Sequence, residues 1–247
     1  MLTWGLNTQA TAERYRGRIA VAESISRRAL EICRSIPDYP ALTIAAGNLG
    51  LCHLRRGDLA EAVAVLEEAN HVINERGTKG HEITLARNAL AEAYLAEAEH
   101  ARGAARVLAL TKAKRACHTA LRSGGLARGG LPGAMRHRGT YALLTGKHHA
   151  ARRWWQRSLT VAKQLGAGDE TAMTSFEMDR RLGERVRSSE TRRFLPRSVP
   201  RSIWRQHRRG LARIGTRKTR EGTFHRTTHF GGNPDHAGSV RYYYMRR

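Results

Sequence analysis

Residues 46–69 read AGNLGLCHLRRGDLAEAVAVLEEA, and this stretch carries the residues of two helices with one turn between them. Three residues share a face of the first helix, because residues three and four apart are neighbours on a helix: Leu49, Gly50 and His53. Gly57-Asp58 then ends that helix and can cap the next, since glycine tolerates the turn and aspartate accepts a bond from an open backbone N–H.

The second helix of the stretch has an inner face of its own, made by Ala62, Leu66 and Ala69. Gly50 and Ala62 are both small, so we expect the two helices to approach closely where these residues meet. The stretch therefore predicts a closely packed helical hairpin.

The spacing Gly–x4–Ala–x6–Ala of this hairpin recurs along the chain. One copy is Gly17, Ala22 and Ala29, the next is Gly57, Ala62 and Ala69, and a looser one is Gly146, Ala151 and Ser158, with Trp155 in place of Leu66. The glycines are 40 and then 89 residues apart, so a divergent copy is expected in the longer interval. Residues 83–123 supply it, with Leu90, Ala91 and Tyr94 on the first helix and Ala113, Cys117 and Ala120 on the second. Periods of this length are typical of a solenoid.

The quoted stretch resembles the tetratricopeptide repeat (TPR). The positions that match the family pattern are Leu49, Gly50, Gly57, Ala62, Leu66 and Ala69. Ala46 and His53 depart from it, because the family favours Trp and Tyr there. The resemblance covers roughly residues 6–183. It implies an all-α, right-handed α-solenoid of about four TPR-like hairpins with a capping helix, and a non-enzymatic module that binds a peptide or partner domain in a concave groove.

The repeat interval is longer than the usual ~34 residues of the family. Long repeats of this kind resemble the carboxyl-terminal TPR sensor arrays of STAND-type signalling ATPases and cyclase-like bacterial regulators, which implies a role in regulation or signalling. The abrupt start and the aperiodic, Arg-rich end are also what a truncated remnant of a larger nucleotide-dependent regulator would show.

Helical periodicity continues to about residue 184 and then stops. We expect paired helices at 6–16 and 18–35, 41–56 and 59–76, 81–101 and 104–122, and 132–145 and 148–165, with a polar capping helix at 169–184. Pro37 and Pro40 are expected to bracket a loop, and the run SGGLARGGLPG at residues 123–133 to form a flexible link. The sequence thus predicts two parts, a solenoid at 1–184 and a basic, disordered tail at 185–247.

The formal net charge of +23 is unevenly distributed. From Glu184 onward there are 17 basic and four acidic residues, a net +13, which leaves +10 for the preceding part. The tail suggests nucleic-acid binding as an alternative function, because neutralised phosphates release counterions, but we expect this binding to be non-specific and removed by physiological salt.

Composition argues against a membrane or secreted protein. No apolar run is long enough for a membrane helix, and the first residues lack a secretion signal. Cys33, Cys52 and Cys117 each fall within an expected helix and are interpreted as core residues in a reducing cytoplasm. The expected localisation is cytoplasmic.

No set of residues suggests catalysis, a cofactor or a metal. The glycine-rich run lacks the Gly-Lys-Ser/Thr ending of a phosphate loop. His225 and His229 have the spacing of a zinc pair, but the glycines and threonines around them argue against the helix that such a pair requires.

The expected partner surface is the concave groove, lined by the first helix of each hairpin. By register, the candidate groove residues are Asn7, Thr11, Arg14, Leu51, Leu54, Arg55, Asn88, Glu92, Leu95, Arg136, Thr140 and Leu143. They do not reproduce the Lys/Asn set with which some TPR proteins hold a terminal carboxylate, so that ligand is not implied.

Overall fold

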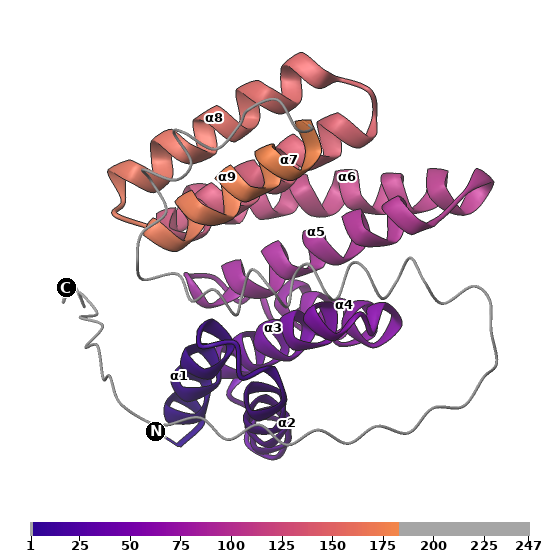
Figure 1. Cartoon of the computed structure of the whole chain (residues 1–247). Coiled ribbons are helices and arrows are strands. Elements are labelled where there is room, and N and C mark those ends of the chain that lie inside the picture. Colours follow the sequence, from indigo (N-terminus) through magenta and orange to yellow (C-terminus); the bar gives the residue numbers. More distant parts are fainter. Residues whose placement is uncertain (1, 183–247) are drawn as a thin grey trace, which may run out of the picture.

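The computed structural model describes residues 2–182, and this part of the chain is an all-helical array (Figure 1). Eight helices pair into four hairpins and a ninth follows. The bounds are α1 (Leu2–Tyr15) with α2 (Ile19–Ser35), α3 (Tyr39–Arg56) with α4 (Leu59–Arg76), α5 (Glu82–His100) with α6 (Gly103–Leu126), α7 (Leu131–Leu144) with α8 (His148–Gln164), and α9 (Gly168–Leu182). The expected tail at 185–247, with His225 and His229, lies outside the described residues.

The array has two layers. The odd-numbered helices pack against one another in order, α1 on α3, α3 on α5, α5 on α7 and α7 on α9. Each even-numbered helix packs between its own hairpin partner and the first helix of the next hairpin. Figure 1 shows the hairpins stacked from α1 and α2 at one end to α8 and α9 at the other. This arrangement confirms the α-solenoid that the repeat spacing predicts.

The second and fourth hairpins each close on a glycine. A Cβ on Gly50 of α3 would lie 2.5 Å from Leu66 Cγ, and a Cβ on Gly139 of α7 would lie 2.5 Å from Trp155 Cδ1. The side chain nearest to Gly50 is therefore that of Leu66, and Ala62, the small residue that the sequence pairs with Gly50, is fully buried on the same helix. Leu66 and Trp155 are both fully buried, which confirms Trp155 as the large core residue of the fourth hairpin.

The turn at Gly57 shows why that glycine recurs. Gly57 has φ 89°, in the left-handed region, and its N–H donates to His53 O at 3.0 Å, so it closes the last turn of α3. The structure places Asp58 at the start of α4 without a side-chain cap bond. Asp58 takes part through its backbone instead, because its N–H donates to His53 O at 3.0 Å and its carbonyl accepts from Ala62 N at 3.1 Å.

The glycine-rich run at 123–133 is not a flexible link. α6 continues to Leu126, a short 3-10 helix spans Arg128–Gly130, and α7 begins at Leu131. A Cβ on Gly124 would lie 2.8 Å from Leu131 Cα, and one on Gly130 would lie 2.6 Å from Thr84 Cβ. These two glycines therefore permit close packing between helices, which the sequence alone does not distinguish from flexibility.

The other departures concern helix ends. α1 begins at Leu2 rather than near residue 6, and Pro40 lies in the first turn of α3 instead of a loop. Proline is tolerated there because the first N–H groups of a helix have no intrahelical partner. The third hairpin has no long connection, since the extra residues lengthen α6 to 24 residues.

The three cysteines are buried, as predicted for core residues. Among the helices of the described part, none combines the length and the apolar character needed to cross a bilayer.

Candidate functional site

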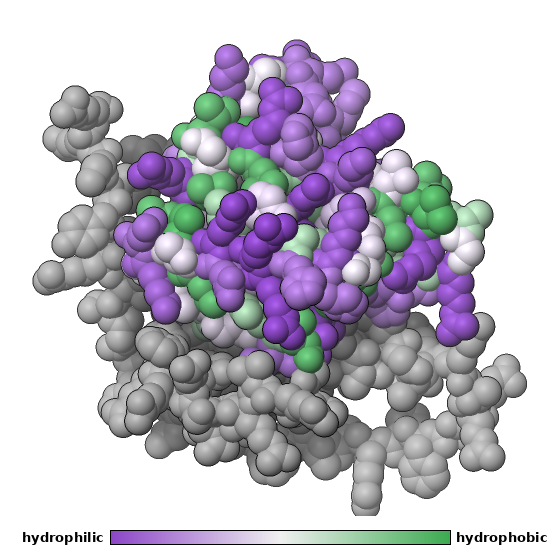
Figure 2. All heavy atoms as spheres, turned by 90° about the horizontal axis from the view of Figure 1, so that it is seen from above, coloured by the Kyte–Doolittle hydropathy of each residue, from purple (hydrophilic) through white to green (hydrophobic). Residues whose placement is uncertain are grey.

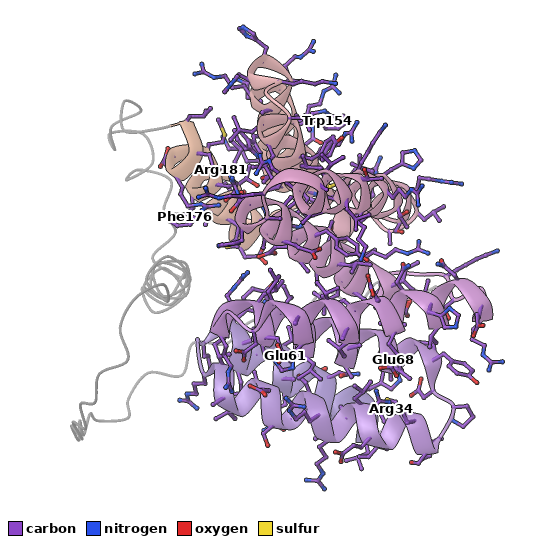
Figure 3. All side chains as sticks on the ribbon, turned by 90° about the vertical axis from the view of Figure 1, so that its right-hand side faces the viewer. Arg34, Glu61, Glu68, Trp154, Phe176 and Arg181 are labelled. Carbon is purple, nitrogen blue, oxygen red and sulfur yellow. The ribbon has the colours of Figure 1, made fainter. Side chains whose placement is uncertain are left out.

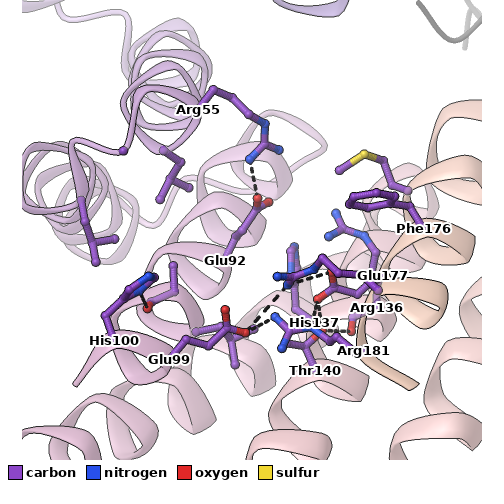
Figure 4. Close-up of a pocket in the computed structure, with 17 residues that line it drawn as sticks. Arg55, Glu92, Glu99, His100, Arg136, His137, Thr140, Phe176, Glu177 and Arg181 are labelled. Atoms are coloured by element: carbon purple, nitrogen blue, oxygen red, sulfur yellow. Dashed lines mark hydrogen bonds and ion pairs between the residues drawn. The ribbon is translucent and has the colours of Figure 1, made fainter. Parts of the chain in front are cut away.

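A pocket of about 80 Å³ lies on the inner side of the array, between α3, α5, α7 and α9. We call it the concave pocket. Its apolar lining includes Leu54, Leu95, Met173 and Phe176, and its charged lining comprises Arg55, Glu92, Glu99, Arg136, Glu177, Arg180 and Arg181. Figure 4 shows these charged side chains grouped around the same space. The volume is room for a few water molecules or one side chain of a partner, and too small for a large ligand.

One side of the concave pocket is an ion pair between neighbouring hairpins. Arg55 of α3 donates to Glu92 Oε1 of α5 at 2.7 Å, and both side chains are largely buried. Burial alone would raise the pKa of Glu92, but the charges of Arg55 and Arg136 hold that pKa well below its usual range. Glu92 is therefore ionised and serves as a fixed acceptor.

The opposite side is a network that ties α9 to α5 and α7. Glu177 of α9 accepts from Thr140 Oγ1 at 2.8 Å and from Arg181 Nε at 2.5 Å, and Arg181 also pairs with Glu99 of α5. Burial opposes ionisation of Glu177, but Arg181, Arg180 and Arg136 together lower its pKa to about 2. The capping helix is thus held by buried charge as well as by packing.

Arg136 and His137 lie side by side at the centre of the pocket and are 7% and 2% exposed. Arg136 Nε contacts Glu170 Oε2 at 3.4 Å, and its charge is supported by Glu92 and Glu177 as well. Burial, reinforced by the charge of Arg136, lowers the pKa of His137 to about 3. His137 is therefore neutral near pH 7, and the pocket presents arginine donors with its carboxylates already engaged.

Half of the predicted groove residues line this pocket: Leu54, Arg55, Glu92, Leu95, Arg136 and Thr140. The other six lie elsewhere. Asn7, Thr11 and Arg14 are bonded to α3, where Asn48 accepts from Thr11 Oγ1 at 3.3 Å and from Arg14 Nε at 3.2 Å. Asn7 Nδ2 donates to Ala41 O at 2.8 Å. In the structure these three side chains connect the first two hairpins.

The remaining three candidate groove residues contact other helices of the array. Leu51 is buried in the core cluster of the second and third hairpins, and Leu143 packs on the cluster around Trp155. Asn88 Nδ2 donates to Gly130 O at 2.9 Å, which fixes the entry to α7. A partner role for these residues stays a prediction.

Sequence reasoning missed the contribution of α9. Its residues Glu170, Glu177 and Arg181 were expected on a polar outer face, but they turn inward onto the buried charges of α7 and α5. Arg136 could have indicated this contribution from the sequence. A buried arginine on the inner face of the last hairpin requires an acidic partner, and the next helix is the element that can supply one. Glu99 and His137 were also missed; Glu99 lies two turns after Glu92 on the same face of α5.

The first and last helices of the array meet. The Tyr15 hydroxyl, at the end of α1, donates to Asp169 Oδ2, at the start of α9, at 2.8 Å. The two residues are 154 positions apart in the sequence. A bond between the ends is unlike an open solenoid, in which each repeat contacts only its neighbours.

Charge is distributed unevenly over the described helices. Residues 1–99 carry 13 acidic and 11 basic residues, whereas residues 100–168 carry 14 Arg and Lys and no acidic residue. On α8, Arg157 lies over the ring of Trp154 at 5.3 Å from the ring centre. Figure 2, which looks onto the array from the side of α8, shows mainly hydrophilic residues with smaller apolar areas between them. The sequence total of +10 for the repeats hides this asymmetry.

Within residues 2–182, no three His, Cys, Asp or Glu side chains are grouped as a metal site requires. Burial raises the pKa values of the Cys33 and Cys52 thiols to about 11 and that of Cys117 to about 12, so these thiols are protonated near neutral pH.

Comparison with known families gives one match. Residues 2–69, which cover α1, α2, α3 and most of α4, match the tetratricopeptide repeat family. This part of the chain is therefore similar to tetratricopeptide repeats. None of the curated proteins matches it. The third and fourth hairpins lie beyond the matched residues. The fourth has the same buried small–large–small positions as the second, Ala151, Trp155 and Ser158, whereas the third has the small residue Cys117 at the central position.

Proposed function

We propose that this TPR array binds a segment of a partner protein in its concave pocket. TPR repeats mediate contacts between proteins, and helical arrays of this kind typically serve as non-catalytic scaffolds. One observation supports this proposal most directly. Leu54, Leu95 and Phe176 lie together with arginine donors on the inner face of α3, α5 and α9. One apolar side chain of the partner inserts there while its backbone carbonyls or carboxylates accept from the arginines.

The arrangement of charges supports a partner that offers acceptors. The carboxylates of Glu92, Glu99 and Glu177 each already accept from an arginine of the array. An incoming cation would have to compete with those arginines, whereas an incoming acceptor can use their remaining N–H groups. We therefore expect apolar–acidic peptides to be preferred over apolar–basic ones.

The test is selection of peptides from a random displayed library on the full chain, followed by affinity measurements on variants. Leu54→Ala and Phe176→Ala, both half-buried pocket residues, should weaken the selected peptides about tenfold. Leu126→Ala and Leu165→Ala are the matched controls, because both leucines are exposed and neither lines the pocket.

Three results would contradict binding of the partner in the concave pocket. Selected peptides that bind both pocket variants as tightly as the native chain would place the partner surface elsewhere. Peptides that lose binding equally with the control variants would indicate an indirect effect on the fold. A preference for basic peptides would contradict the inferred role of the arginines.

We further propose a regulatory or signalling role in the cytoplasm, with residues 1–184 as the array and 185–247 outside it. The support is the resemblance of long TPR repeats to the sensor arrays of STAND-type ATPases and cyclase-like regulators. If the chain is a remnant of such a regulator, an adjacent reading frame should encode the nucleotide-dependent switch domain.

Nucleic-acid binding is the second candidate, favoured by the acid-free run at 100–168 in addition to the basic tail. The expected binding is electrostatic and sequence-independent. In the full chain, the triple variant Arg152→Gln, Arg153→Gln, Arg157→Gln should flatten the salt dependence of oligonucleotide binding more than the control triple Arg28→Gln, Arg34→Gln, Lys79→Gln. Equal effects would mean that α8 makes no distinct contribution.

A further inference from the structure

A second hollow, of about 210 Å³, lies where α4, α5 and α6 meet, and it shares no lining residue with the concave pocket. We call it the outer hollow. Figure 1 shows the three helices adjacent in the middle of the array. Its volume exceeds the ~150 Å³ of an engineered cavity that takes up benzene, so a small organic ligand fits.

The outer hollow is lined by cations from two helices. Lys112 and Arg115 come from α6 and Arg87 comes from α5. Two of the lining residues bind a carboxylate, because Glu67 of α4 accepts from the Tyr94 hydroxyl at 2.5 Å and from Lys112 at 3.3 Å. In the part of the chain that the structure describes, no carboxylate forms an ion pair with Arg87 or Arg115. The lining itself thus contains three cations and no carboxylate.

Arg87 has only neutral hydrogen-bond partners in the part of the chain that the structure describes. Its guanidinium donates only to neutral groups, Ser123 Oγ at 2.5 Å and Asn74 Oδ1 at 3.3 Å, and its Nε is buried without a partner. Burial, with the nearby charge of Arg122, lowers its pKa. A partly buried cation without a counter-ion is costly, and a bound anion would remove that cost.

The rest of the lining sets the kind of anion. Leu90, Ala116 and Tyr94 form an apolar side, while Asn70 and Thr119 add neutral polar groups. Arginine binds the oxygens of a phosphate with its planar fork, and lysine acts as a point charge. A phosphate monoester carries close to two negative charges near neutral pH and three acceptor oxygens. We propose that the outer hollow binds a phosphate monoester dianion carried on a small organic group.

The experiment is calorimetric titration of the full chain with phenyl phosphate, and α6 offers a matched pair of variants. Lys112 lines the hollow, whereas Lys114, two residues along the same helix, is exposed and does not. Lys112→Gln should weaken binding about tenfold, as expected for loss of a charged hydrogen bond, and so should Arg115→Gln. Lys114→Gln should leave the affinity unchanged, and both lysine variants keep the basic tail.

Two further measurements test the dianion. Phenyl sulfate has the same ring and one charge, so it should bind more weakly than phenyl phosphate. Phenyl phosphate itself should bind more tightly at about pH 8 than at about pH 5, because its second proton dissociates near pH ~6. Equal affinity for the two esters would overturn the assignment of a phosphate site. So would an absence of saturable binding at millimolar concentration, or equal losses in Lys112→Gln and Lys114→Gln. A phosphoserine peptide that binds tightly while phenyl phosphate does not would assign the hollow to a phosphorylated protein instead.

Discussion

The second and fourth hairpins solve the same packing problem with residues of very different size. In both, a glycine on the first helix receives a large side chain from the second, Leu66 opposite Gly50 and Trp155 opposite Gly139. Trp155 also donates its indole N–H to Arg136 O at 3.1 Å, a bond that Leu66 lacks. The comparison teaches that a glycine on the first helix can receive large residues of different size, and that the larger partner additionally fixes the register between helices.

The third hairpin extends this comparison. At the equivalent positions it has Ala91 and Cys117, which are both fully buried. Ala91 is larger than its counterpart Gly50 in the second hairpin, and Cys117 is smaller than its counterpart Leu66. Complementary size, rather than a particular residue, is what the hairpins share.

The largest expected effect comes from filling the glycine space. Gly139→Leu and Gly50→Leu each introduce a Cβ 2.5 Å from a buried side chain, so each should destabilise the array by at least about 3 kcal/mol in urea unfolding. Gly139→Leu should cost more, because Trp155 is also held by its hydrogen bond. Gly5→Ala is the control, since its added Cβ would meet nothing within 4 Å. A loss below about 1 kcal/mol in either leucine variant would contradict the interlocking of glycine and large residue.

A smaller effect should follow from transplanting the third hairpin's pair into the second. Gly50→Ala alone adds bulk against Leu66, and Leu66→Cys alone leaves a void, so each should cost about 1–3 kcal/mol. The double variant should cost less than the sum by more than about 0.5 kcal/mol, measured as a double-mutant cycle in urea. Strict additivity would mean that the two positions are not coupled by size.

The two hairpins should also differ in their response to pH. His137 in the fourth hairpin corresponds by register to Asn48 in the second, and only the histidine titrates. Because its pKa is about 3 when folded and 6.5 as a reference, the unfolded chain takes up the proton first, and stability falls as pH drops below about 6.5.

Between pH 6.5 and 5 this loss amounts to roughly 2 kcal/mol, and His137→Gln should remove most of it. The measurement is the free energy of unfolding of both proteins at these two pH values. The Glu177 contribution does not interfere, because its pKa is lowered from 4.5 to about 2 and its stabilisation is lost only below pH 4.5. An unchanged slope in the variant would contradict the burial of a neutral His137.

The smallest effect concerns the outer helices. α4 of the second hairpin pairs Glu68 with Arg34 of α2 at 2.8 Å, and Figure 3 shows these two side chains facing each other, whereas α8 of the fourth hairpin has no acidic residue. Both members of the pair are about half exposed. Arg34→Gln should therefore cost less than about 1 kcal/mol, and the difference should disappear in high salt. A loss that persists in high salt would point to packing by the arginine stem.

The sequence predicts the hairpins well because their signal is local. Helix boundaries, the Gly57 turn and the buried positions Ala62, Leu66 and Ala69 all follow from spacings of a few residues. The divergent third hairpin was located by counting residues between better copies, and its Ala113, Cys117 and Ala120 are buried as expected.

The features that the sequence did not predict depend on contacts between residues far apart in the chain. Gly124 and Gly130 look like a linker until their neighbours Leu131 and Thr84 are known. Glu177 looks like a surface residue until Thr140 and Arg181 are found beside it. The sequence predicted only part of the concave pocket. The helical register placed Arg55, Glu92 and Arg136 on the inner face, but no local pattern indicated that α9 would cover that face.

The bond between Tyr15 and Asp169 has a consequence for how the array loses structure. In an open array each end frays on its own, and unfolding spreads inward from whichever end is weaker. Here the bond joins the last turn of α1 to the first turn of α9, so opening of either turn breaks it and the two turns are coupled. Amide hydrogen exchange in these two turns should then slow or quicken together, although one belongs to the first helix of the described array and the other to the last.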